Sequence, residues 1–504
     1  MAGHKRTRTG CWTCRETGYK CDEQKPHCGR CIRLNKECKG YGVKLKWRNA
    51  AVTTSSEPRN AGRGGSVDQT SVASPSSISS PVSVSSIRSA PAMLDKPPHE
   101  GLRETAMALT PAIPPQLAPD LSQSDRRLLH YWIEQLSLLI SVAPRRRQPN
   151  PFQVHLGSMA YNYGALRSTV LSMAANHLAV VSNDVTLRIQ AYRHQRDAVI
   201  LLQQLIQDPH QAELEQALAT VMMMQVSARL LGEEEEPHVA NHLIGAKAMI
   251  ARNGGLAAWN TSASARFLLS LFAYHDILSS VSRGSRPLVD HTSEFRAIEG
   301  AASMESVAEV LHVVARISEL QHKAKSERNS SNQSNLSEES FALGTEIQQS
   351  LLAMDFPLGK GDPEDSRDIN LTAQAYRHAA FIYLYRGWLD VGAPNPSTLN
   401  HVQQCITCIE QISVDSSLAS SHIWPLFTAG CEAVDDAQRQ FIRERFQAMY
   451  QSRKFPSLRR VMRDIEEVWA AKDMEQITNG LDGMSKIDCI QVILRRRGRE
   501  VDLA

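Results

Sequence analysis

The 504-residue sequence lacks the features that mark several common classes of protein. It has no apolar run long enough to span a bilayer, and its opening, MAGHKRTRTG, has no apolar segment of the signal-peptide kind. It also has no glycine-rich phosphate loop, no H-E-x-x-H motif and no G-x-S-x-G nucleophile elbow. We therefore expect neither a membrane partner nor an enzyme activity.

Cysteine, by contrast, is concentrated in one short segment. Six of the ten cysteines lie between Cys11 and Cys38, in the spacing C-x2-C-x6-C-x6-C-x2-C-x6-C. This is one half-motif and its copy 17 residues later, which suggests a two-fold metal site. A structural zinc binds four tetrahedral ligands, with thiolates about 2.3 Å from the metal. Two zinc ions need eight ligand positions, so among six thiolates two sulfurs must bridge.

The alternative interpretation of these cysteines is a set of disulfides, which is typical of small secreted chains. The basic opening without a signal peptide argues against it. About 40 residues are also too few to fold around an apolar core alone. Metal binding has to supply the folding free energy, roughly 10–16 kcal/mol for one structural zinc in small peptides. We expect residues 1–48 to be unfolded without zinc.

Positive charge gathers on the same segment. Residues 1–50 contain 13 Lys and Arg against four Asp and Glu, a balance of +9, whereas the rest carries 43 against 49, or −6. Two Zn2+ ions and six thiolates add −2, which leaves the module near +7. A compact basic module is typical of a nucleic-acid binder, because neutralised phosphates release counterions. A merely soluble basic tail is the other interpretation.

Residues 8–48 resemble a known family, the fungal Zn2Cys6 binuclear-cluster transcription factors. In that family two short helices fold around paired zinc ions, and the first and fourth cysteines bridge them. The resemblance therefore implies that Cys11 and Cys28 bridge the two metals. Besides the cysteines, the likeness rests on Gly10-Cys11-Trp12-Thr13-Cys14-Arg15, Cys21-Asp22-Glu23, Pro26 and Cys38-Lys39-Gly40-Tyr41.

The same resemblance assigns the terminal ligands and two Zn2+ ions per cluster. Cys14 and Cys21 would complete one zinc site, and Cys31 and Cys38 the other. Double-stranded DNA is the implied partner, with CGG-like sites as the expected target.

The segment between the second and third cysteines departs from the family pattern. Many members have a basic run there that enters the major groove, whereas Thr17 and Gly18 stand at positions that are usually basic. A Lys or Arg that reaches guanine discriminates bases by about 1–3 kcal/mol, which glycine cannot do. Gly18 also permits a positive φ and could end the first helix. Base preference thus stays open, and we expect phosphate contacts from Arg15, Lys20, Lys25, Arg30 and Arg33.

Residues 49–120 have the composition of a disordered, Ser- and Pro-rich linker. Residues 51–90 hold 13 serines, few charges and hardly an aromatic side chain. No sustained heptad pattern follows the cluster, so a coiled-coil dimer in this segment is disfavoured. Binding as a single module and a homodimer through the C-terminal domain both stay open.

The pattern of residues 121–504 predicts a large all-α domain, because apolar residues recur with helical period and almost never alternate with polar residues as in a strand. The polar stretch Ser326–Glu339 and an acidic loop at Gly361–Asp368 should interrupt it. A first helix should open at Ser124-Asp125 and end before Pro144. The other expected helices are Gly164–Val181, Val185–Ile206, Leu214–Leu231, His238–Arg252, Ala263–Val281, Ser303–Lys325, Phe341–Met354, Thr372–Trp388, Ser397–Ile412, Ile423–Val434, Asp436–Tyr450, Leu458–Ala471 and Asp488–Arg495.

This domain is similar to the second type of fungal-specific transcription factor regulatory domain. The resemblance implies a regulatory, effector or dimerisation role without a catalytic constellation. It rests on Ala246-Lys247-Ala248-Met249-Ile250 before Gly254-Gly255, on Phe272-Ala273-Tyr274-His275-Asp276, and on Trp424-Pro425-Leu426-Phe427-Thr428-Ala429-Gly430-Cys431-Glu432.

Two features of the domain leave room for other chemistry. His275-Asp276 is similar to the dyad of metal phosphohydrolases, but no further ordered His and Asp ligands stand out, so a histidine in the fold is the better interpretation. Cys405 and Cys408 could sense oxidants or a metal, although small core cysteines at helical spacing are commoner. An enzyme is thus the least supported hypothesis.

We predict a nuclear, zinc-dependent, sequence-specific DNA-binding regulator of transcription at RNA polymerase II promoters. The transcription machinery is its expected protein partner. The alternative is a co-regulator that carries the cluster but acts mainly through protein partners, with weak base readout. Activation and repression are both compatible with the sequence.

Overall fold

The computed structural model describes residues 11–17, 19–24, 27–36, 38–39, 119–141, 150–207, 214–232, 242–259, 262–291, 305–330, 336–356 and 363–504. The chain divides into two compact units, residues 1–92 and 93–504. Residues 40–118, which hold nearly all of the predicted linker, lie outside the described residues.

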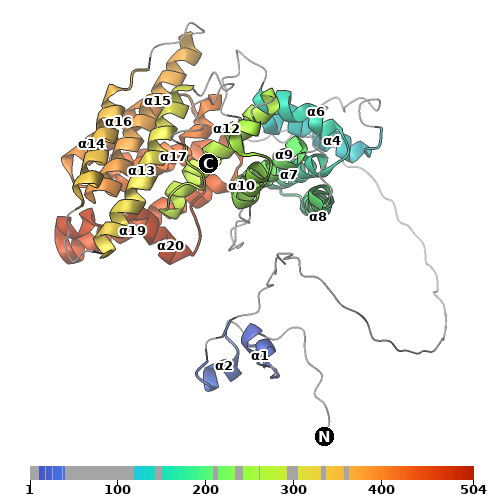
Figure 1. The fold of residues 1–504 in the computed structure, drawn as a ribbon, viewed down its shortest axis with the longest axis horizontal. Coiled ribbons are helices and arrows are strands. Elements are labelled where there is room, and N and C mark those ends of the chain that lie inside the picture. Colours follow the sequence, from blue (N-terminus) through green and yellow to red (C-terminus); the bar gives the residue numbers. More distant parts are fainter. Residues whose placement is uncertain are drawn as a thin grey trace, which may run out of the picture. The chain divides into compact units, whose positions relative to one another are not determined.

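The first unit contains two helices of five residues each, α1 (Trp12–Glu16) and α2 (Gly29–Arg33) (Figure 1). Each begins directly after a cysteine, Cys11 or Cys28, whose sulfur accepts a hydrogen bond from a backbone N–H of its helix. The helices are therefore capped by the residues that the sequence marks as metal ligands.

The second unit is helical and has no strand among its described residues. The order of elements is α4 (Gln123–Tyr131), the π-helix η1 (Trp132–Leu136), α5 (Ser137–Ile140), the π-helix η2 (Gln153–Gly157), α6 (Ser158–Tyr161), α7 (Ala165–Ser182), α8 (Val185–Gln207), α9 (Leu214–Leu231), α10 (His242–Arg252), α11 (Gly255–Trp259), α12 (Ala263–Arg283), α13 (Glu305–Ser330), α14 (Glu338–Ala353), α15 (Pro363–Leu384), the π-helix η4 (Tyr385–Leu389), α16 (Pro396–Glu410), the 3-10 helix η5 (Ser417–His422), α17 (Ile423–Glu432), α18 (Asp436–Arg453), α19 (Pro456–Ser485) and α20 (Cys489–Arg497).

These helices form two packed groups around one continuous apolar core. In the first group, α7 packs against α4, α8 and α9; in the second, α15 packs against α13, α16 and α17. Helix α12 contacts both α9 and α13, and Figure 1 shows it between the two groups. Helix α19 packs against α17, α18, α20 and α9. Helices α12 and α19 therefore join the two groups into one domain.

Local signals explain where the central helix starts and stops. The Ser262 hydroxyl accepts a hydrogen bond from the backbone N–H of Ala265 at 2.9 Å, which caps the start of α12. Gly284 ends α12 with φ of 59°, a left-handed conformation that glycine adopts without steric cost. Between these caps, Leu268, Phe272 and Ile277 are fully buried in the core.

Buried ion pairs add fixed contacts between distant parts of the domain. The Glu432 carboxylate accepts hydrogen bonds from Lys472 Nζ at 2.5 Å and Arg386 Nη2 at 2.9 Å. Arg460 Nε of α19 donates to Asp502 Oδ2 at 2.8 Å, and Arg229 Nη2 of α9 donates to Glu500 Oε2 at 2.6 Å. The C-terminal segment is thus bound to both α19 and α9.

Some predicted boundaries differ from the structure. The interruption expected over Ser326–Glu339 is shorter, because α13 continues to Ser330 and α14 begins at Glu338. Helix α15 begins at Pro363, inside the predicted acidic loop Gly361–Asp368, because a proline and acidic residues suit the first turn of a helix. Helix α19 extends to Ser485, well beyond the predicted end at Ala471, with non-helical backbone at Gly480.

The described helices include none with the length and apolar character that a bilayer crossing requires.

Candidate metal centre and nucleic-acid interface

The six cysteine sulfurs of the first unit lie together. Four sulfurs, from Cys11, Cys14, Cys21 and Cys28, are within 4.8 Å of one another. Cys11 and Cys28 form a second such group with Cys31 and Cys38. The sulfurs of Cys11 and Cys28 thus belong to both groups and lie 3.6 Å apart.

The sulfur separations match those of thiolates that share a tetrahedral metal. Two ligands 2.3 Å from a zinc ion at the tetrahedral angle lie about 3.8 Å apart. The Sγ atoms of Cys14 and Cys28 are 3.7 Å apart, and those of Cys11 and Cys31 are 3.9 Å apart. The donor set, its geometry and its burial therefore fit two zinc ions.

The backbone around the sulfurs repeats with the 17-residue period of the sequence. The N–H of Cys11 donates to Cys21 Sγ at 3.3 Å, and the N–H of Cys28 donates to Cys38 Sγ at 3.4 Å. The N–H of Cys14 donates to Cys11 Sγ, and the equivalent N–H of Cys31 donates to Cys28 Sγ. Such N–H donors stabilise negative charge on a thiolate. The duplication in the sequence is a duplication of structure.

Cysteines make up the entire buried apolar set in the described part of this unit. Cys11 and Cys28 are fully buried, whereas Ile32 and Leu34 are 64% and 53% exposed. Burial raises the pKa of the Cys14 thiol to about 12, and it also raises the pKa values of Cys11 and Cys31. Without a metal these thiols keep their protons at neutral pH, so metal binding must release protons.

Two residues outside the predicted ligand and DNA-contact sets hold the unit together. The Asp22 carboxylate accepts hydrogen bonds from the N–H groups of Gly29 at 3.0 Å and Arg30 at 2.8 Å, which ties the first half to the start of α2. The Thr13 hydroxyl accepts from the N–H of Lys39 at 2.9 Å, which fixes the segment after the last cysteine. Both contacts span the two halves, and residue spacing gives no signal for them.

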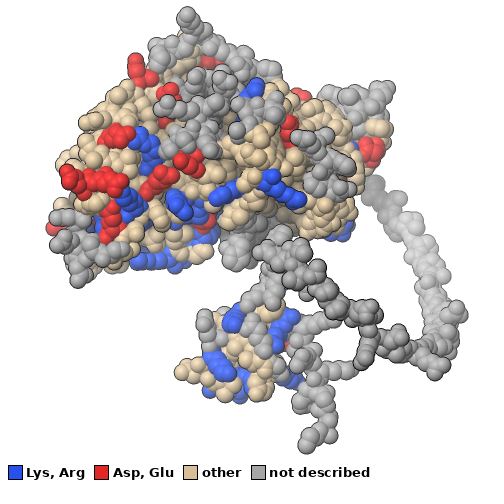
Figure 2. Space-filling model, viewed as in Figure 1, with Lys and Arg blue, Asp and Glu red and all other residues tan. Residues whose placement is uncertain are grey.

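The predicted phosphate contacts lie on the surface of the unit. Arg15, Lys20 and Arg33 are exposed, and Arg30 is half-buried. The Arg15 guanidinium lies over the Trp12 ring at 4.3 Å, and that of Arg30 lies over Tyr19 at 4.0 Å. Figure 2 shows Lys and Arg spread over the visible face of the unit. Stacking on a ring orients each arginine without neutralising its charge.

The segment that departs from the family pattern is only partly described. The Thr17 hydroxyl donates to the carbonyl of Thr13 at 2.6 Å, within its own helix turn. Gly18 and Lys25 lie outside the described residues. In the second half, the position equivalent to Gly18 is Asn35, whose φ of 49° is left-handed and follows the end of α2. The proposed helix-ending role of Gly18 stays a prediction.

The alternative chemical sites of the second unit have structural roles. The Asp276 carboxylate accepts from the N–H of Leu288 and lies 2.9 Å from His291 Nε2, so it anchors the segment after α12. His275, its neighbour, is not part of that contact. Cys405 and Cys408 are buried core residues of α16. Among the described residues, groups of three or more metal-ligating side chains occur at the cysteine cluster alone.

Both units match known protein families. Residues 127–503, which are 377 of the 504 residues, match the model of the fungal specific transcription factor domain. Residues 9–48 match the fungal Zn(2)-Cys(6) binuclear cluster domain, a domain that binds two zinc ions. No solved structure matches the chain.

Curated relatives match either the whole chain or the cluster. An uncharacterized transcriptional regulatory protein of Schizosaccharomyces pombe is 23% identical over an alignment that covers 92% of each chain. Arginine metabolism regulation protein II of Saccharomyces cerevisiae is 53% identical over 45 residues, 9% of this chain and 5% of its own length. White-opaque regulator 2 of Candida albicans is 60% identical over 37 residues, 7% of this chain and 8% of its own length.

The first unit has six cysteine sulfurs that fit two zinc ions and a basic surface around them. The all-α second unit matches the fungal specific transcription factor domain. The chain belongs to the fungal transcription factors that join a Zn(2)-Cys(6) binuclear cluster to a fungal specific transcription factor domain, and it is a zinc-dependent, DNA-binding regulator of transcription.

Proposed function

We propose that this regulator acts in the nucleus, at RNA polymerase II promoters, and reads a specific DNA sequence through its cluster. The observation that carries the proposal is the sharing of Cys11 and Cys28 between two groups of four sulfurs, which positions α1 and the basic helix α2 on one small unit. In this proposal Cys11 and Cys28 bridge, Cys14 and Cys21 complete one zinc site, and Cys31 and Cys38 complete the other. The family consists of transcription factors rather than enzymes, and we propose no catalytic activity.

The DNA contacts divide into positioning and readout. Arg15, Lys20, Arg30 and Arg33, together with Lys25, contact phosphates and fix the orientation of the unit on the duplex. Readout falls to the end of α1, at Thr17 and Gly18. The Thr17 hydroxyl donates within its own helix, so it is committed as a donor. Backbone carbonyls there can accept from the N4 amino group of cytosine, which is compatible with a CGG-like site.

The competing hypothesis is a co-regulator that keeps the cluster but acts mainly through protein partners, including the transcription machinery. The absence of basic side chains at positions 17 and 18 favours it. Selection from random duplex DNA separates the two, with the full chain and residues 1–60 each tested zinc-loaded and chelated. Zinc-dependent enrichment of one motif supports direct readout. Zinc-loaded protein that enriches no motif supports the co-regulator.

We also propose that the second unit forms a homodimer through α8. Val185, Ile189, Tyr192, Val199 and Ile206 are between 42% and 68% exposed. Their spacing of four, three, seven and seven residues is a heptad seam, which is the pattern that pairs with another helix. The dimer that these residues favour is isologous.

Sedimentation equilibrium of the full chain tests the dimer. Ile189→Arg should convert it to a monomer, because it places a cation on the seam. Ile477→Arg is the matched control, since Ile477 is 82% exposed on α19, away from the seam. A wild-type chain that is monomeric at tens of micromolar, or an Ile189→Arg variant that dimerises like the wild type, would contradict the proposal. A dimer should also select DNA motifs that contain two half-sites.

A further inference from the structure

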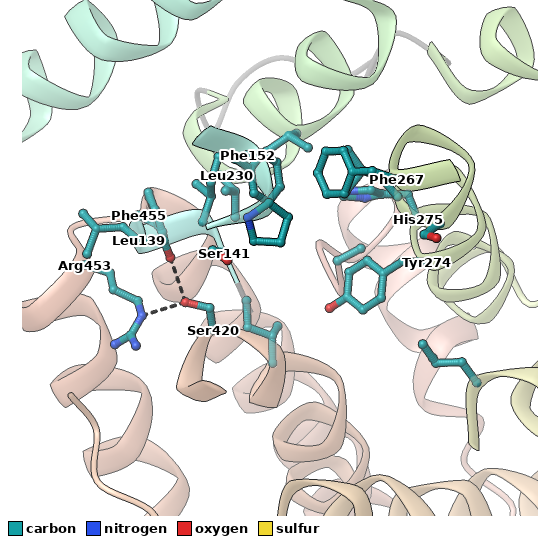
Figure 3. A pocket seen from close by; sticks show the side chains of 18 of the residues that line it. Leu139, Ser141, Phe152, Leu230, Phe267, Tyr274, His275, Ser420, Arg453 and Phe455 are labelled. Atoms are coloured by element: carbon teal, nitrogen blue, oxygen red, sulfur yellow. Dashed lines mark hydrogen bonds between the residues drawn. The ribbon is translucent and has the colours of Figure 1, made fainter. Parts of the chain in front are cut away.

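The helical domain contains a cavity of about 130 Å3 between its two groups of helices (Figure 3). Its walls come from both groups, with Leu139 on α5 and Leu230 on α9 from the first, and Met449 on α18 from the second. Helix α12, which joins the groups, contributes Phe267 and Tyr274. A molecule in this cavity would contact the elements whose packing holds the domain together.

Aromatic rings form much of the wall. The rings of Phe152 and Phe267 meet edge to face, with centroids 5.2 Å apart and an interplanar angle of 83°. Tyr274 and Phe455 also line the cavity, and Figure 3 shows these rings around it. Aromatic walls favour a flat aromatic occupant, because offset-stacked and edge-to-face contacts add to the free energy of apolar burial.

The cation at the cavity wall is already occupied by protein acceptors. Arg453 Nε donates to Ser420 Oγ at 2.8 Å, and its other two nitrogens donate to the carbonyls of Val414 and Ser416. Ser420 Oγ in turn donates to the carbonyl of Leu139 at 2.9 Å, as the dashed lines in Figure 3 show. The guanidinium is therefore not directed at an acid in the cavity, which argues for an uncharged occupant.

His275 is a polar side chain on this wall with hydrogen-bonding capacity to spare. It is 3% exposed, and its Nδ1 atom has no hydrogen-bond partner within the described residues. Burial and the nearby charge of Arg229 lower its pKa to about 3, so the ring is neutral at physiological pH. A neutral imidazole offers one donor and one acceptor. Buried polar groups are normally bonded, so this one requires an explanation.

The size of the cavity suits a single ring or a small fused pair of rings. An engineered apolar cavity of about 150 Å3, lined by Leu, Ile and Phe, stays dry and binds benzene. We propose that this cavity is a binding site for a small, neutral aromatic molecule with one hydroxyl or N–H group, which hydrogen-bonds His275. A bound molecule would contact both helix groups and so couple them. The regulatory domain could thereby respond to the concentration of that molecule.

Thermal unfolding and calorimetric titration of the zinc-loaded full chain test the site with three probes: benzene, phenol and indole. All three should bind, and each should raise the Tm of the helical domain by about 2 °C or more at saturation. Phenol and indole should bind about 3–10-fold more tightly than benzene, because each can hydrogen-bond His275. A Tm that none of the three probes raises would overturn the proposal.

Two variants place the probes in this cavity. Ala308→Leu fills it from α13, so it should raise the Tm without ligand and weaken phenol binding about tenfold or more. Ala342→Leu, an exposed alanine on α14, should leave phenol binding unchanged. His275→Phe keeps an aromatic ring but removes the ring nitrogens, and it should abolish the preference for phenol over benzene while benzene still binds. Phenol binding to Ala308→Leu with wild-type affinity would place the probe elsewhere and overturn the assignment.

Discussion

The cluster module and the helical domain differ in what fills their interiors. In the described part of the module, the buried apolar set consists of cysteines alone, and the aliphatic side chains of Ile32 and Leu34 face outward. In the helical domain, aliphatic and aromatic side chains from helices across the domain form one continuous core. The module depends on the chemistry of six atoms, whereas the domain depends on the volume and pattern of many side chains. The module should therefore fold or unfold with the gain or loss of its metal. The domain should tolerate single substitutions in its core with a partial loss of stability.

Removal of zinc should produce the largest difference between the two regions. A strong chelator should unfold the module, because zinc supplies roughly 10–16 kcal/mol per structural site. The helical domain should keep its unfolding transition, since its core contains no metal ligand set in the described residues. Amide signals in NMR spectra report on the module, and far-UV circular dichroism on the domain. Dispersed amide signals from the module after chelation would show that it stays folded without zinc and would contradict this prediction.

Loss of a buried charge in the helical domain should have the second largest effect on stability. Glu432→Gln leaves Lys472 and Arg386 buried without their carboxylate, so the free energy of unfolding should fall by about 3–5 kcal/mol. The control is Glu339→Gln, which breaks the Lys323–Glu339 pair, whose side chains are 39% and 84% exposed. There we expect at most about 1 kcal/mol. Chemical denaturation followed by circular dichroism measures both, and equal losses in the two variants would sink this prediction.

The Glu432 carboxylate should also make the stability of the domain depend on pH in acid. Burial alone would raise the pKa of Glu432, but the charges of Lys472 and Arg386 outweigh it and lower the pKa to about 2, from an ordinary value of 4.5. A lowered pKa means that its contribution to stability is complete above about pH 4.5 and is lost as the pH falls towards 2. Denaturation curves between these pH values should show a shallower loss of stability in Glu432→Gln. Parallel curves would contradict the assignment.

Loss of a side chain that caps a helix should lower stability by a similar amount in both regions, and by less than the loss of the buried charge. Asp22→Ala removes the acceptor for two N–H groups at the start of α2, and Asp435→Ala removes the acceptor for two at the start of α18. Each should cost about 0.5–2 kcal/mol. In the module the loss should appear as weaker zinc binding, measured by competition with a chelator. In the domain it should appear as a lower denaturation midpoint. Unchanged zinc affinity in Asp22→Ala would refute its structural role.

Surface cations should change DNA binding and leave stability almost unaffected. With about five phosphate contacts, log K should fall against log salt with a slope near −4.5. Arg33→Gln should reduce that slope by about 0.9 and weaken binding to all sequences alike. Arg443→Gln on α18, an arginine 45% exposed, is the control and should change neither. Fluorescence anisotropy at several salt concentrations measures the slopes, and a flat response would argue against direct DNA contact.

Prediction from the sequence succeeded where the signal was local. The cysteine spacing singled out six residues whose sulfurs lie together, because ligands only a few residues apart leave little conformational choice. Helical periodicity predicted most of the long helices of the domain, although Pro363 and its acidic neighbours were assigned to a loop instead of a helix start. The contacts of Asp22 and Thr13 were missed, since each joins residues from different halves of the module.

The sequence by itself determined that a metal-built basic module is joined to an all-α domain, because ligand type, charge and apolar period are properties of neighbouring residues. Only the tertiary structure decided that α12 joins two helix groups, that Glu432 meets Lys472, and that His275 lines a cavity beside Phe267. These facts depend on packing between residues far apart in the chain. Many packings are compatible with one local pattern, and the best burial of the whole core selects among them.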